Sequence, residues 1–99
     1  MVPAQIGPVR VGSQILTPRK VVDIPPVYPE TARTAGIAGV VMLEVTIGAD
    51  GSVTNARVLR SIPQLDASAV EAVRQWRYEP TLINGTAVPV IIVVPVRFP

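Results

Sequence analysis

Residues 65–80 read LDASAVEAVRQWRYEP, and this stretch decides what the rest of the chain can form. Its apolar positions recur at i, i+3, i+4 and i+7, the spacing of one helical face: Ala69, Ala72, Val73 and Trp76. Asp66 is suited to cap the start of this helix, because its carboxylate can accept the free backbone amides of the first turn. Pro80 is expected to end the helix, since the residue before a proline avoids helical dihedrals. We therefore predict an amphipathic helix that buries Trp76.

A β-hairpin pattern precedes this helix. Side chains alternate over residues 39–47, and one set is expected to face the core: Val41, Leu43, Val45 and Ile47. A four-residue loop over 48–51 follows, in which Gly51 supplies the positive φ that the turn needs. In the second strand, residues 52–60, the apolar positions change phase, which predicts a bulge near Thr54–Asn55.

A shorter helix and a last strand complete the pattern. Pro29 fits the first position of a helix, where its missing amide costs nothing, and Gly36 fits a left-handed C-terminal cap. We therefore expect a helix of about two turns over 29–35. Asn84–Gly85 predicts a turn into the last strand, Val88–Phe98, whose even-numbered residues are expected to face the core.

These elements predict an α+β fold. The expected core is a three-stranded antiparallel sheet in the order second, first and last strand, with two helices packed on one face. Residues 1–24 contain prolines and little periodicity, so we expect an extended arm there, with a short strand at Pro8–Val11 or Ile15–Thr17. The domain itself is assigned to residues 25–99.

The composition excludes most catalytic chemistry. The 99 residues include no histidine and no cysteine, which removes the commonest general base, metal ligand and thiol nucleophile. We therefore expect no catalytic residues, no metal site and no cofactor. A net charge of +2 with 4% aromatic residues is a weak basis for binding nucleic acid. No apolar run reaches membrane-spanning length and no signal-peptide pattern opens the chain, so we expect a segment of a longer protein.

The last strand offers a physical basis for binding. A strand at the end of a sheet presents unpaired amides and carbonyls that an extended peptide can use. Pro89 and Pro95 cannot donate, so their side of the strand is expected to be the open one, with Ile91 and Val93 as its free donors. The alternative is that the prolines only block edge-to-edge aggregation. The residues alone leave both interpretations open.

In their order along the chain, these segments resemble the C-terminal domain of the TonB family. The resemblance covers roughly residues 25–98, and its most specific parts are Tyr28–Pro29, the Asp50–Gly51 turn, Ser61, Leu65–Asp66 and the exit Trp76–Pro80. It implies that the TonB-box segment of an outer-membrane receptor docks as a strand beside the last strand. The implied partner-binding residues lie in that strand and just before the short helix: Val90, Ile91, Ile92, Val93, Val94, Val96, Pro25, Val27 and Tyr28.

The same resemblance implies a cellular setting. The domain would be a non-enzymatic periplasmic adaptor that grips a receptor peptide and transmits force for active transport. In the full-length protein it would be attached to the inner membrane, and ExbB- and ExbD-like proteins would act through an anchor that this chain lacks. The alternative is a TonB-like interaction module of a membrane sensor or peptidase, or of a cell-wall-binding protein. A monomer and a strand-exchanged homodimer are both left open.

Overall fold

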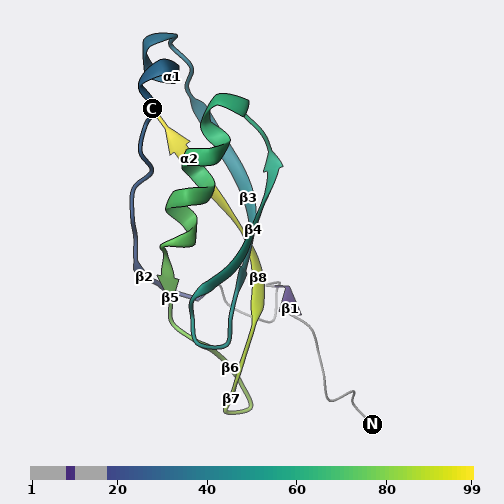
Figure 1. Cartoon of the computed structure of the whole chain (residues 1–99). Helices are drawn as coiled ribbons and strands as arrows, with labels where there is room; N and C mark the ends of the chain where they lie inside the picture. Colours follow the sequence, from purple (N-terminus) through teal and green to yellow (C-terminus); the bar gives the residue numbers. More distant parts are fainter. Residues whose placement is uncertain (1–8, 11–17) are drawn as a thin grey trace.

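The computed structural model describes residues 9–10 and 18–99 of the chain. Within them lie a central sheet, two helices and two small two-stranded sheets (Figure 1). The helices are α1, Glu30–Thr34, and α2, Pro63–Arg74. The central sheet contains β1, Val9–Arg10; β3, Gly39–Ile47; β4, Val53–Arg60; and β8, Val90–Phe98. The small sheets pair β2, Lys20–Val22, with β5, Arg77–Tyr78, and β6, Thr81–Ile83, with β7, Thr86–Val88.

The central sheet has the order β1-β8-β3-β4, and β3 runs antiparallel to both β4 and β8. The predicted α+β fold, with its order of second, first and last strand, is therefore confirmed. α2 lies across one face of this sheet, and α1 lies at the end where the chain terminates (Figure 1). β1 adds a short fourth strand parallel to β8, within the predicted strand Pro8–Val11. The other predicted site for it, Ile15–Thr17, lies outside the described residues.

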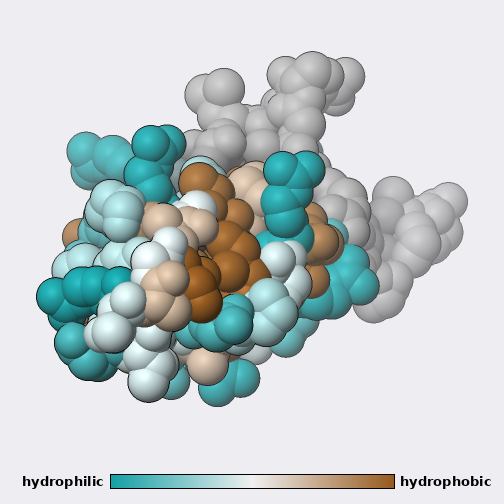
Figure 2. All heavy atoms as spheres, turned by 90° about the horizontal axis from the view of Figure 1, so that it is seen from above, coloured by the Kyte–Doolittle hydropathy of each residue, from teal (hydrophilic) through white to brown (hydrophobic). Residues whose placement is uncertain are grey.

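The core lies between α2 and the sheet. Alternate residues of β3 and the even-numbered residues of β8 are buried, as predicted from the period of two: Val41, Leu43, Val45, Ile47, Val90, Ile92, Val94, Val96 and Phe98. The helix supplies the predicted stripe: Ala69, Ala72, Val73 and Trp76, together with Leu65. Seen from the end that carries α1 and the C-terminus, hydrophobic atoms form a central strip between hydrophilic groups (Figure 2).

The loop between β3 and β4 is held by a glycine and a carboxylate. Gly51 has φ +92°, which confirms the predicted positive dihedral, and its carbonyl accepts a 2.8 Å hydrogen bond from the Tyr78 amide. The hydroxyl and amide of Ser52 donate to the Asp50 carboxylate over 2.7 and 3.0 Å, and this holds the pKa of Asp50 below its usual range. The register of β3 and β4 shifts opposite Thr54, so the predicted bulge is confirmed.

The start of α2 differs from the prediction. The helix begins at Pro63, three residues before Asp66, and its N-cap is Ile62, which makes no side-chain cap. Asp66 is therefore not the N-cap. Its carboxylate instead reaches back to accept the Ile62 amide over 2.9 Å and the hydroxyl of Ser61. Proline at the first helical position sets this earlier start, and the acidic side chain still suits the positive end of the helix dipole.

The predicted exit of this helix at Pro80 is also wrong. α2 ends at Arg74, and the next residues turn into the strand β5, which pairs with β2. This pairing removes Arg77–Tyr78 from the helix, while Trp76 still reaches the core. The shorter helix and the last strand differ from prediction only at their ends. Pro29 is the N-cap of α1 rather than its first residue. β8 begins at Val90 rather than at Val88, directly after Pro89, which has no amide for strand pairing.

The turn before the last strand is confirmed. Asn84 and Gly85 have φ of +51° and +80°, the two positive values of a type I′ turn, and they join β6 to β7. None of the helices in the described part of the chain has the length and apolar character needed to cross a membrane.

Candidate functional site: the outer edge of β8

β8 is bordered by β3 along its whole length on one side and only briefly on the other. Its pairing with β3 runs from Ile47 opposite Val90 to Gly39 opposite Phe98. In an antiparallel ladder, successive residues direct their backbone groups alternately to one neighbour and the other. Pro95 has no amide to donate, so the odd-numbered residues of β8 direct their backbone groups to the outer side. The outer side of the edge is therefore assigned from the proline, as it was in the sequence.

The first part of this edge is not open. β1 pairs there in parallel, with Val9 beside Val90 and Arg10 beside Ile91. The prediction that Ile91 offers a free donor is therefore wrong, because the chain's own N-terminal strand lies beside it. From Ile92 to Phe98, no strand within residues 9–10 and 18–99 pairs with the outer side. Val93 keeps its place on the open part of the edge, with a side chain that is 49% exposed.

A groove of about 390 Å³ lies against this open part. Half of the residues that line it belong to β8: Ile92, Val93, Val94 and Pro95. The other half come from β2, from β5 and from residues near them: Pro18, Lys20, Trp76 and Tyr78. Most of these side chains are apolar, and the groove is large enough to take one or two side chains of a peptide. An added strand beside β8 would thus find both backbone partners and a place for its side chains.

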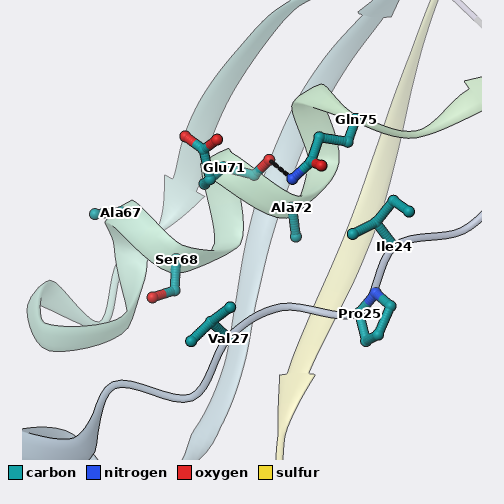
Figure 3. A pocket seen from close by; sticks show the side chains of 8 residues that line it. All are labelled: Ile24, Pro25, Val27, Ala67, Ser68, Glu71, Ala72 and Gln75. Carbon is teal, nitrogen blue, oxygen red and sulfur yellow. Dashed lines mark hydrogen bonds between the residues drawn. The ribbon is translucent and has the colours of Figure 1, made fainter.

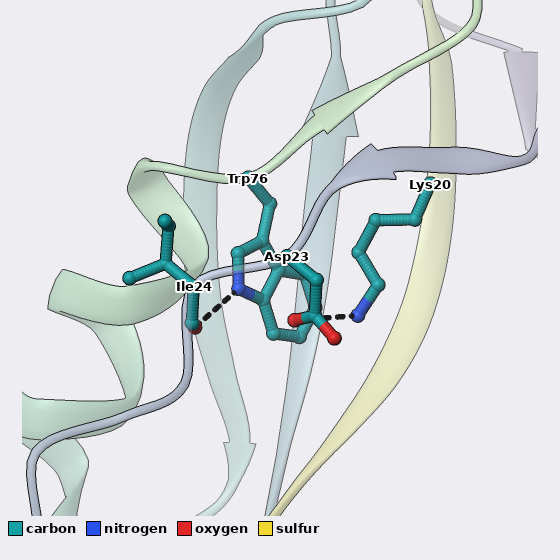
Figure 4. Close-up of polar contacts among 4 residues, drawn as sticks. All are labelled: Lys20, Asp23, Ile24 and Trp76. Atoms are coloured by element: carbon teal, nitrogen blue, oxygen red, sulfur yellow. Dashed lines mark hydrogen bonds and ion pairs between the residues drawn. The ribbon is translucent and has the colours of Figure 1, made fainter.

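Lys20 and Trp76 form the far wall of the groove. The Lys20 Nζ lies 3.4 Å from the centroid of the Trp76 ring and 3.3 Å from the Asp23 carboxylate. The Trp76 Nε1 donates a 2.8 Å hydrogen bond to the Ile24 carbonyl (Figure 4). The cation–π contact and the ion pair fix the lysine over the ring, and Lys20 and Trp76 line the groove together with residues of β8.

Tyr78 is the second aromatic side chain in this wall. It is 5% exposed, and burial, with a smaller contribution from the negative charge of Asp23, raises the pKa of Tyr78 to about 12. Its backbone is held on two sides, by Lys20 in β2 and by the carbonyl of Gly51. The groove wall is therefore built from segments that are far apart in the sequence and joined by backbone pairing.

Pro25 and Val27, two of the predicted binding residues, lie elsewhere. With Ile24 they face α2 across a separate groove of about 330 Å³ (Figure 3). The helix side of that groove consists of Ala67, Ser68, Glu71, Ala72 and Gln75. Val27 is 77% exposed, so it is accessible, but the two grooves have no lining residue in common.

Tyr28, the remaining predicted binding residue, makes contacts within the domain itself. Its hydroxyl donates to the Ile37 carbonyl, and its ring packs edge-on against Phe98 with centroids 5.5 Å apart. Phe98 is the last residue of β8, so Tyr28 supports the end of that strand. These contacts assign Tyr28 a role in packing. The predicted binding residues from Val90 to Val96 all lie in one strand, β8.

The sequence profile of the family described as Gram-negative bacterial TonB protein C-terminal matches residues 24–99. The chain belongs to this family. A Protein TonB of Vibrio cholerae is 39% identical over 78 residues, which are 77% of this chain and 32% of that protein. A Protein TonB of Xanthomonas campestris pv. campestris is 40% identical over 76 residues, or 75% of this chain and 34% of its own length. The chain thus spans about a third of the length of these curated relatives.

The fold has a solved counterpart in the TonB family. The solution NMR structure of the Pseudomonas aeruginosa TonB CTD matches with a TM-score of 0.68 and 32% sequence identity. The match covers 82% of this chain and 84% of the solved one. The resemblance seen in the sequence, at the Tyr28–Pro29 pair and the Trp76–Pro80 exit, is therefore a true family relationship.

Sequence reasoning missed the residues that line the groove from outside β8. Pro18 and Lys20 precede the matched TonB family segment, which begins at residue 24, and they lie in the region expected to be an extended arm. Trp76 was expected to be buried, which is confirmed, but not to border a groove beside β8. Lys20–Val22 forms β2 by pairing with the distant strand β5, and three residues carry no periodic signal that could have indicated this pairing.

Proposed function

We propose that this chain is the periplasmic C-terminal domain of a TonB-like energy transducer. It binds the TonB-box segment of an outer-membrane receptor as an added strand beside β8 and transmits force for active transport. The rest of the protein attaches it to the inner membrane, where ExbB- and ExbD-like proteins act on the anchor. The relatives' name, Protein TonB, favours this role over that of a sensor, peptidase or cell-wall module.

One observation carries the binding part of the proposal: the outer edge of β8 accepts a strand. β1 pairs with it at Val90 and Ile91, and the adjoining stretch from Ile92 has no strand beside it in residues 9–10 and 18–99. A receptor peptide that continues along this edge gains backbone hydrogen bonds with Val93 and with the residues after Pro95. Its side chains on the core side enter the groove beside Trp76 and Tyr78.

Force transmission follows from the same ladder. A peptide paired with β8 is attached to the strand that supplies five buried residues to the core, and β8 in turn pairs with β3 at nine positions. Tension on the peptide is therefore carried into the middle of the sheet rather than into a loop. The domain needs no catalytic residue for this role, which agrees with a chain that lacks histidine and cysteine.

A peptide titration tests the proposal. The isotope-labelled chain is titrated with a synthetic TonB-box peptide, and the amide signals are followed by NMR. We expect micromolar or weaker affinity, with the largest shifts at Val93 and its neighbours, because few backbone bonds are available on this edge. A peptide with proline at alternate positions is the control, since it has the same length but lacks the donors on one side.

Two substitutions in β8 sharpen the test. Val93→Pro removes an outward amide without touching the ladder to β3, and it should weaken binding about 2- to 10-fold, the value of one backbone hydrogen bond. Val93→Thr keeps the amide and is its matched control. Pro95→Val adds a donor and should tighten the complex, with increased self-association through the unblocked strand. Shifts confined to another surface at saturating peptide would exclude strand addition to β8.

A further inference from the structure

The chain's own β1 lies on the edge that the proposed function assigns to a receptor peptide. Its two residues pair in parallel with Val90 and Ile91, at the beginning of β8. Among the outward residues of β8, Pro95 has no amide, so the edge has outward donors at Ile91, Val93 and Arg97. β1 lies beside the first of these three. The two donors that remain are separated by Pro95.

We propose that β1 is an intramolecular competitor of the receptor peptide, so that the docked arm lowers the affinity of the β8 edge. This inference rests on the proposed function and adds a means of regulation to the same site. A peptide that pairs with the whole edge must take the place of β1 beside Ile91. A peptide that leaves β1 docked loses that donor and is restricted to the part from Ile92 onward.

The competition is expected to be modest and reversible. β1 is joined to the domain through the chain that leads to β2 at Lys20, so its effective concentration at the edge is high. Only Val9 and Arg10 pair, however, and each backbone hydrogen bond contributes little net stability. The arm therefore lowers affinity by a small factor instead of closing the site. The direction of the peptide does not matter, because parallel and antiparallel strands use the same outward groups of β8.

The test uses the whole 99-residue chain and the synthetic TonB-box peptide. The double variant Val9→Pro with Arg10→Pro removes both amides of β1, and it should bind the peptide about 2- to 10-fold more tightly than the parent. In the free protein, the Ile91 amide should exchange with solvent faster in this variant. Two controls accompany it: Arg10→Gln alone removes the charge, and Ala4→Pro with Gln5→Pro adds prolines before β1. Both controls should bind like the parent.

Each outcome of this experiment supports or overturns the proposed competition between β1 and the peptide. Equal peptide affinity in the parent and the double variant would overturn the competition while leaving strand addition intact. Weaker binding by the double variant would overturn it too, because β1 would then be part of the binding surface. Tighter binding by Arg10→Gln to the same extent would assign the effect to charge. If the peptide binds none of these proteins, the proposed function fails and the competition fails with it.

Discussion

Gly51→Ala tests the contact between the β3–β4 loop and β5. Gly51 has φ +92°, and a Cβ added there would lie 2.0 Å from the carbonyl oxygen of Tyr78. The left-handed dihedral alone costs about 1–2 kcal/mol for a residue with a side chain. The close approach forces the backbone at Tyr78 away, which weakens the bond from its amide to the Gly51 carbonyl, at about 0.5–1.5 kcal/mol. We expect a total loss of about 1.5–3.5 kcal/mol in the free energy of unfolding.

Gly85→Ala is the matched control. Gly85 also has a positive φ, +80°, but an added Cβ would find no atom within 4 Å. It therefore carries the dihedral cost of about 1–2 kcal/mol without the steric one. The difference between the two variants isolates the close approach to Tyr78.

Urea unfolding at 25 °C, followed by the fluorescence of the single tryptophan, measures both variants. Trp76 is buried and borders the same wall as Tyr78, so its emission reports the region that the substitution disturbs. Losses for Gly51→Ala and Gly85→Ala that agree within about 0.5 kcal/mol would refute the argument. The loop would then require glycine for its dihedral only, and its packing against β5 would be loose.

Three further predictions concern stability. Trp76→Phe keeps a ring but loses the bond to the Ile24 carbonyl, so circular dichroism should show a loss of about 1–2 kcal/mol in unfolding free energy. Asp66→Ala should cost about 1 kcal/mol because the Ile62 amide loses its acceptor, whereas Asp66→Asn, which retains an acceptor oxygen, should cost less in the same measurement. Burial raises the pKa of Tyr78 from 10.0 to about 12. The stability that the folded state gains from the neutral phenol is therefore fully present below pH 10 and is lost as pH rises toward 12. Urea midpoints against pH should show this loss in the parent and not in Tyr78→Phe.

The central sheet could be predicted because its strands carry strong periodic signals. β3 and β8 alternate over nine residues each, so one phase of the side chains must face the core. The turns at Gly51 and Asn84–Gly85 were equally clear, because positive φ restricts the residue types that fit. These local signals agree with the fold, and the predictions made from them are confirmed.

The ends of α2 were predicted wrongly because two local signals competed there. Pro63 and Asp66 are both typical of a helix start. The helix begins at Pro63, and Asp66 in its first turn accepts the amide of the N-cap residue Ile62. At the other end, the apolar stripe continues through Trp76, but pairing of Arg77–Tyr78 with β2 ends the helix first. Tertiary context of this kind routinely overrides the intrinsic helix propensity of a few residues.

The candidate site could be predicted only in its central part. The prolines identified the outer side of β8, since a missing amide is visible in the sequence. The two- and three-residue strands β1 and β2 have no period of their own and form through pairing with distant segments. Lys20 could not be assigned to the groove for this reason, although it lies 3.4 Å from the Trp76 ring centroid.

The alternation of β8 separates stability from binding within one strand. Its even-numbered residues are buried, from Val90 at 0% to Val94 at 8% exposed, so changes there affect the core. Its odd-numbered residues direct their backbone groups to the outer edge, where they leave the ladder to β3 untouched. Under the proposed function, Pro95 limits both partner binding and self-association, because it removes one donor from that edge. We therefore expect substitutions at Val93 and Pro95 to alter the proposed peptide binding while the fold is preserved.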